Sequence, residues 1–81
     1  MKFHLVVEFK SDLDLFPFTK NFNAPNCKTA FKKVQEMTKK FNEEGATVIG
    51  AKLSHINEHF QDIYEVAELR NTAKREWCYM D

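Results

Sequence analysis

Glycine, proline and cysteine are scarce in this chain of 81 residues, which contains two of each. Two glycines cannot build a glycine-rich loop that cradles phosphates, and no nucleophile elbow is present, which argues against a nucleotide-binding enzyme. Cys27 and Cys78 are too few and too far apart to form a disulfide framework. We therefore expect a reduced, intracellular protein in the cytoplasm.

Net charge and long apolar runs are also missing. Twelve basic and twelve acidic side chains cancel, whereas proteins that bind nucleic acids are usually basic, because counterion release from phosphates supplies much of their affinity. No run approaches the roughly 18 apolar residues of a transmembrane helix. Glu8 and Lys10 interrupt the first apolar segment before it reaches the length of a signal sequence. The sequence thus predicts no membrane partner.

Apolar residues are abundant, and they indicate a folded protein. They make up 43% of the chain and include eight phenylalanines, which excludes disorder caused by low hydrophobicity and high net charge. A chain of this length buries about 60–65% of its unfolded surface and cannot be divided into two self-sufficient cores. We expect one compact domain that spans residues 1–81.

Residues 26–45 carry the clearest structural signal, an amphipathic helix with both ends marked. Apolar side chains recur at the spacing of one helical face, and Asn26 can cap the first turn by accepting a hydrogen bond from a backbone N–H. Gly45 suits the left-handed residue that follows many helices, because it has no Cβ to clash. Cys27 falls on the apolar face, where a thiol serves as a small hydrophobic group.

Three strands are predicted around this helix. Residues 2–10 alternate between apolar and polar side chains, which is typical of a half-buried strand. A weaker strand is expected at residues 15–22, where Pro17 favours an edge position because it has no N–H. Residues 46–53 are rich in β-branched side chains, and Gly50 indicates a bulge or a close backbone approach.

Residues 54–72 are ambiguous between a helix and a second hairpin. Turning the residues by about 100° each places the apolar side chains on one arc and the acids on the other, so we favour a helix capped by Ser54. The alternative is a strand pair over residues 47–56 and 63–69 around a polar turn. The predicted fold is therefore α+β: a small antiparallel sheet, made of a hairpin and a third strand, covered on one face by two helices in the order ββαβα. The alternative order is ββαββ. The predicted core comprises Phe3, Leu5, Val7, Phe9, Phe18, Ala30, Phe31, Val34, Met37, Phe41, Val48, Ile49, Phe60, Ile63 and Ala67.

The succession of hairpin, helix, glycine and β-branched strand over residues 2–53 resembles small phage-encoded proteins. The stretch APNCKTAFKKVQEMTKKFNEEGATVIGAKL carries the resemblance, with Ala30 as the conspicuous alanine of the helix. Some anti-CRISPR inhibitors have this arrangement, and a further hairpin often follows in them. The resemblance implies a small phage protein that inhibits or modulates a host protein, and it transfers no functional residue.

Acidic residues of the last third and the aromatic end of the chain are the leading candidates for a partner-binding surface. No lysine or arginine separates the acids on the expected second helix, where like charges three or four residues apart repel, so this face suits a basic partner. The alternative, which we favour for the charges alone, is that the lysines of the first helix lie beside this face and neutralise it. The end of the chain is unusually apolar for a tail. The predicted interface comprises Glu58, Asp62, Glu65, Glu68, Trp77 and Tyr79.

A stripe of lysines offers a second candidate surface. Lys28, Lys32 and Lys39 lie on the outer side of the first predicted helix and could contact the phosphates of a nucleic acid. No interleaved aromatic residue offers stacking for bases. Pairs of lysine and glutamate on the same helix are also the usual surface of a solvated helix.

A pair of histidines offers a third candidate site. His55, Glu58 and His59 match H-x-x-E-H, a pattern of zinc metalloproteases in which two imidazoles one helical turn apart hold Zn²⁺. A catalytic site would also need a third ligand and a substrate cleft, and an 81-residue chain has little material left to build that cleft. We therefore favour the interpretation that these residues edge a helix face without binding a metal.

The sequence as a whole predicts a non-enzymatic protein that binds another protein, as an inhibitor or modulator, without a cofactor or a catalytic residue. This conclusion depends on the lack of a phosphate loop, of a complete active site and of a basic net charge. Nucleic-acid binding is the first alternative, and metal binding at His55 and His59 is the second. The identity of the partner and the oligomeric state, with a homodimer among the options, stay open.

Overall fold

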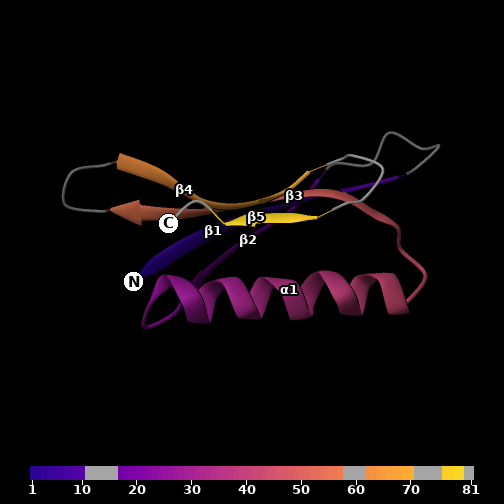
Figure 1. The fold of residues 1–81 in the computed structure, drawn as a ribbon, viewed down its shortest axis with the longest axis horizontal. Coiled ribbons are helices and arrows are strands. Elements are labelled where there is room, and N and C mark those ends of the chain that lie inside the picture. Colours follow the sequence, from indigo (N-terminus) through magenta and orange to yellow (C-terminus); the bar gives the residue numbers. More distant parts are fainter. Residues whose placement is uncertain (11–16, 58–61, 71–75, 80–81) are drawn as a thin grey trace.

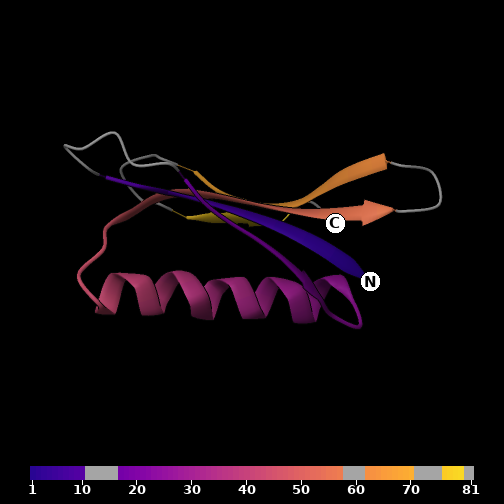
Figure 2. The same cartoon turned by 180° about the vertical axis from the view of Figure 1, so that it is seen from behind.

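The computed structural model describes residues 1–10, 17–57, 62–70 and 76–79. It contains, in chain order, β1 (Lys2–Phe9), β2 (Phe18–Asn23), α1 (Cys27–Glu43), β3 (Val48–Asn57), β4 (Asp62–Leu69) and β5 (Trp77–Tyr79). The five strands form one antiparallel sheet, and α1 packs against one of its faces (Figure 1, Figure 2). The described chain is therefore a two-layer α+β unit.

The strands lie in the order β2-β1-β3-β4-β5, and each pair of neighbours is antiparallel. β1 thus lies between β2 and β3, and α1 carries the chain across β1 from one neighbour to the other. Figure 1 shows α1 beneath the sheet, with no described element over the opposite face. We call the face towards α1 the inner face and the opposite one the outer face.

β1 supplies the centre of the core because its side chains alternate between the two faces, as predicted. Phe3, Leu5 and Val7 point to the inner face and are fully buried. Phe3 stacks on Phe22 of β2, with 5.7 Å between the ring centroids. Burial of a large apolar side chain contributes about 1.5–3 kcal/mol, so this alternation determines which face of the sheet α1 covers.

α1 begins and ends as its sequence predicts. Asn26 Oδ1 accepts a hydrogen bond of 2.7 Å from the Thr29 N–H, and Gly45 adopts a φ of +96° just beyond the helix. The side chain of Asn42 accepts a further hydrogen bond, of 3.0 Å, from the Val48 N–H. These contacts fix the direction in which the chain enters α1 and leaves it for β3.

The predicted second helix is wrong, and the alternative strand pair is confirmed. β3 and β4 form an antiparallel hairpin over the residues that were assigned to that helix. β5, which was not predicted, pairs with β4 and gives the order ββαβββ for the described elements. Within the described ranges, one helix rather than two covers the sheet.

A bulge in β4 explains why these residues look helical in the sequence. The register of β3 and β4 shifts between Leu53 and Ser54, which leaves Val66 as an extra residue of β4. The alternation changes phase there, so Glu65 and Glu68, three residues apart, both lie on the outer face. Acids three residues apart also share one face of a helix, and the sequence pattern therefore fits both structures.

The sequence predicts a bulge or a close backbone approach at Gly50, and β3 does have a bulge at the residue before it. Glu8 pairs with Gly50 and Phe9 pairs with Val48, so Ile49 is the extra residue of β3. This position leaves Ile49, a predicted core residue, only half-buried.

Most of the predicted core is confirmed, with one clear error. Ile63 is 70% exposed, because its position in β4 turns the side chain to the outer face. Phe60 lies outside the described residues. Leu53 of β3 and Leu69 of β4 were not predicted in the core, yet both are buried beneath α1. The core is therefore larger on the β3–β4 side than the sequence indicated.

Candidate functional site

The outer face is the candidate site, because it is the part of the sheet that α1 leaves open. Its side chains come from alternate positions of the strands, and the pairing register brings them side by side. From β2 to β5 they are Thr19, Asn21 and Asn23; Lys2, His4, Val6 and Glu8; Gly50, Lys52, Ser54 and Ile56; Ile63, Glu65 and Glu68; and Cys78. The face is polar at the β2 side, and acidic and aliphatic at the β4 side.

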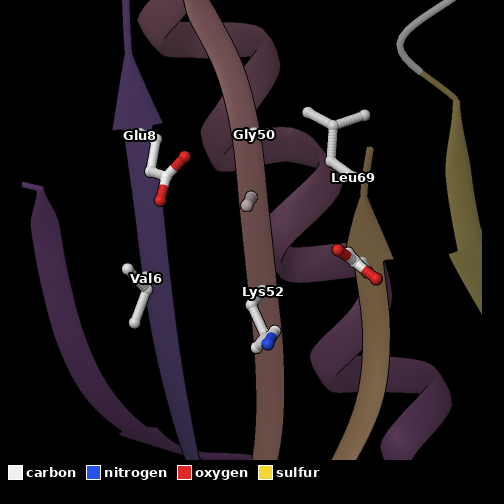
Figure 3. Close-up of a pocket in the computed structure, with 7 residues that line it drawn as sticks. Val6, Glu8, Gly50, Lys52 and Leu69 are labelled. Atoms are coloured by element: carbon white, nitrogen blue, oxygen red, sulfur yellow. The ribbon is translucent and has the colours of Figure 1, made fainter. Parts of the chain in front are cut away.

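A hollow of about 200 Å³ lies in the middle of the outer face, over Gly50. Glu8 of β1 and Glu68 of β4 line it, with Val6 and Lys52 beside them, and Figure 3 shows Glu8 extending towards Gly50. The hollow exists because Gly50 has no side chain: an added Cβ would lie 3.4 Å from Glu8 Oε2. Two carboxylates around a hollow of this size suit the ammonium or guanidinium group of a partner's side chain.

Lys52 neutralises the acids of the outer face only in part. Lys52 Nζ lies 3.9 Å from Glu65 Oε1, and the two side chains are 56% and 34% exposed. Exposed ion pairs of this kind are weak. Around the hollow, the three carboxylates of Glu8, Glu65 and Glu68 therefore outweigh one ammonium group, and this part of the outer face is negatively charged.

An aliphatic pair adjoins the acids. Ile63 lies directly opposite Ile56 of β3, and it is the most exposed of the large apolar side chains in the described ranges. Ile56 is the last but one residue of β3 and Ile63 the second residue of β4, and this end of the two strands extends beyond the N-terminal end of α1 (Figure 1, Figure 2). Asp62, which belongs to the predicted interface, is the first residue of β4.

The sheet divides the predicted acidic and aromatic interface. Glu65 and Glu68 lie on the outer face, whereas Trp77 and Tyr79 lie on the inner face. Both of these rings contact Phe31 of α1, with 5.5 and 5.1 Å between the centroids. Glu65 and Glu68 therefore do not share a face of the sheet with the two aromatic side chains.

His55, one of the two candidate zinc ligands, lies in β3 and not on a helix. Its ring faces the rings of Phe3 and Tyr64, at 5.3 and 6.5 Å between centroids. Glu58 and His59 lie outside the described residues. Within the described ranges, no group of three or more His, Cys, Asp or Glu side chains could hold a metal ion.

The predicted lysine stripe lies along one flank of α1. Lys28, Lys32 and Lys39 are all exposed, and their spacing places them within about 40° of one another around the helix. Lys39 also lines a hollow of about 440 Å³ together with Trp77 of β5. The stripe thus has an aromatic neighbour, which was missed because it comes from a strand that was not predicted.

The residues around Gly50 were not recognised as a site from the sequence. The alternation of β1 does place Glu8 on the polar side of its strand, and Gly50 stands out as a glycine within a strand. What the sequence could not supply is the register that pairs these two residues and places Glu68 nearby. Each strand therefore shows its own signal in the sequence, but the pairing that brings Glu8, Gly50 and Glu68 together is not visible there.

Within the described ranges, no helix has the length and apolar character needed to cross a bilayer. Comparisons of the chain with models of protein families, with curated proteins and with solved structures find no significant match. The geometry of the site is therefore the evidence that bears on function.

Proposed function

We propose that this protein is a non-enzymatic binding module that engages another protein through its outer face and thereby inhibits or modulates that partner. The observation that carries the proposal is Ile63, a large apolar side chain that is 70% exposed on a face with the carboxylates Glu65 and Glu68. An apolar anchor with charged residues at its margin is the usual composition of a protein interface.

The chemistry of the outer face defines the partner. The Ile56–Ile63 pair would fill a shallow apolar depression, and the acids along β1 and β4 would meet lysine or arginine side chains. The hollow over Gly50 has room for the tip of one such side chain, held between Glu8 and Glu68. The partner is therefore a protein with a basic surface that contains an apolar patch.

Charge reversal on the outer face tests this proposal. The double variant Glu65→Lys/Glu68→Lys is compared with Glu36→Lys/Glu43→Lys, which makes the same change in net charge at exposed positions of α1. Affinity purification from host cells, followed by mass spectrometry, should recover a partner with the wild type and with the α1 variant only. Equal recovery with both double variants would show that the outer face is not the interface.

A second candidate function, binding of single-stranded nucleic acid, is favoured by the lysine stripe and its neighbour Trp77. Lysines supply phosphate contacts, and an indole ring supplies a surface on which a base can stack. Binding that depends on Lys28, Lys32 and Lys39 should weaken with salt, with a slope of about −0.7 per phosphate contact on logarithmic axes. If a salt titration with DNA and RNA oligonucleotides shows no binding at low ionic strength, this candidate is removed.

A further inference from the structure

A groove runs along the inner side of the molecule between α1 and the edge strand β2, away from the outer face. We call it the helix–strand groove. It encloses about 350 Å³, and its lining residues are Phe18, Lys20, Lys33, Met37, Lys40, Phe41 and Glu44. No part of it was identified as a site from the sequence, and none of its residues belongs to the outer face.

The floor of the groove is apolar and firmly packed. Phe18, Met37 and Phe41 are half-buried against the core. The ring of Phe41 meets Phe18 edge to face at 5.2 Å, and it meets Phe9 of β1 in the same way at 5.3 Å. Such contacts hold the aromatic floor in place, so an incoming apolar side chain would meet a preformed surface.

The rim of the groove is basic. Lys20 comes from β2, and Lys33 and Lys40 come from α1, and all three are exposed. Glu44 is the one acid among the lining residues. Lysines often protect an edge strand from aggregation, which accounts for Lys20, and Lys33 Nζ lies over the ring of Phe22, 5.0 Å from its centroid. The two lysines of α1 line the same hollow from the other side, and this arrangement indicates a negatively charged ligand.

β2 adds a third property, a free backbone edge beside the groove. It is at the end of the strand order, and within the described ranges it pairs with β1 alone. An edge strand presents a row of N–H and C=O groups that can pair with an extended chain. A peptide added to β2 would place alternate side chains over the floor of the groove.

We propose that the helix–strand groove binds an extended, acidic peptide segment of a partner protein, which pairs with β2 as an additional strand. An apolar side chain of the peptide rests on Phe18, Met37 and Phe41, and acidic side chains two residues before and after it meet the lysines of the rim. This site is independent of the proposed outer-face function, because the two surfaces lie on opposite faces of the sheet.

The spacing of the lysines fits this ligand. Lys33 and Lys40 are seven residues apart on α1, which is about 10.5 Å along the helix axis. Acids four residues apart on an extended strand are separated by about 13 Å, and flexible lysine side chains can bridge the difference. A helical ligand would leave the edge of β2 unpaired, and a small amphiphilic anion would use neither the edge nor all three lysines.

The test uses the full chain and a fluorescent peptide with the sequence Ser-Glu-Thr-Leu-Thr-Glu-Ser. Fluorescence anisotropy measures binding to the wild type, to Lys33→Glu/Lys40→Glu and to Lys32→Glu/Lys39→Glu. The second double variant is a matched control, since its lysines have the same spacing and exposure on the opposite flank of α1. We expect the first variant to weaken binding by at least about tenfold and the control by less than about threefold.

A second measurement tests the pairing with β2. Peptides N-methylated at one alternate set of backbone amides should lose binding, and peptides methylated at the other set should retain it, because alternate amides point to opposite edges of a strand. Circular dichroism establishes that both double variants are folded. The proposal is overturned by equal losses in the two variants, by indifference to N-methylation, or by a wild-type dissociation constant weaker than about 1 mM. It is also overturned if an oligonucleotide or a fatty acid displaces the peptide at a lower concentration than the unlabelled peptide does.

Discussion

The helix–strand groove is lined mainly by basic side chains and the hollow of the outer face mainly by acidic ones, and the two hollows arise from different structural features. The groove has three lysines around a floor of packed aromatic side chains, whereas the hollow at Gly50 has two glutamates around a missing side chain. The first can therefore accept an apolar group together with an anion, and the second only the tip of a cationic side chain. Two surfaces of a small protein can thus be suited to partners of opposite charge.

This division also shows why the zero net charge is weak evidence about partners. α1 and the helix–strand groove carry more lysines than acids, and Glu65 and Glu68 of β4 lie on the opposite, outer face of the sheet. A total of zero therefore does not mean that each surface is neutral. The net charge of a protein limits its nonspecific attraction to charged molecules, but it does not give the local charge of a face that is only a few side chains wide.

Truncation of Phe3 should have the largest effect, because it removes the packing on which both surfaces rest. Phe3 is fully buried and contacts Phe22 and His55, so Phe3→Ala should lower the free energy of unfolding by about 3–5 kcal/mol. The control Val6→Ala changes the same strand on the outer face and should cost less than about 1 kcal/mol. Urea unfolding followed by circular dichroism measures both. Losses of similar size would contradict the assignment of inner and outer faces.

The N-terminal part of the fold could be predicted because each of its signals is local. The alternation of β1 lies within one strand, and the caps of α1, Asn26 and Gly45, act within a few residues of the helix ends. The C-terminal part could not be predicted, because its key feature is the bulge at Val66. A bulge breaks the alternation by one residue, and the two resulting phases imitate the periodicity of a helix.

The candidate sites depend even more on strand register and helix packing, which cannot be read from the sequence. Glu65 was recognised as part of an acidic surface, and it is exposed as expected, yet its neighbours on the outer face come from the other strands. Ile63 was assigned to the core because it is apolar, and its exposure can be seen only once the faces of β4 are known. Lys20 and Lys33 meet only through the β2–α1 packing. Pairing and packing, not residue type, create both surfaces.

The two glycines offer a test of intermediate size, one beside each surface. Gly45, next to the end of the groove, has a φ of +96°, and an L-residue is strained there, so Gly45→Ala should lower the free energy of unfolding by about 1–2 kcal/mol. At Gly50 the added Cβ would make ordinary contacts of 3.4 and 3.5 Å. Gly50→Ala should therefore change stability by less than about 1 kcal/mol, in the stabilising direction.

The same pair of variants should separate the two surfaces in binding. Gly50→Ala places a methyl group in the hollow on the outer face, close to Glu8, and should weaken recognition of a basic partner, while binding of the acidic peptide to the groove stays unchanged. Thermal unfolding and fluorescence anisotropy give the two readouts. If Gly50→Ala were more destabilising than Gly45→Ala, the backbone at Gly50 would be strained or its surroundings more crowded than the structure shows.

Neutralisation of Lys52 should have the smallest effect on stability and a clear effect on binding rates. Its ion pair with Glu65 is long and exposed, so Lys52→Met should change the free energy of unfolding by no more than about 0.5 kcal/mol. The outer face becomes more negative, and association with a basic partner should become faster at low salt and depend more steeply on ionic strength. Lys32→Met, which makes the same change in charge on α1, is the control, and stopped-flow mixing measures the rates. Slower association for Lys52→Met than for the control would mean that Lys52 itself contacts the partner, and that the outer face recognises an acidic group there rather than a cation.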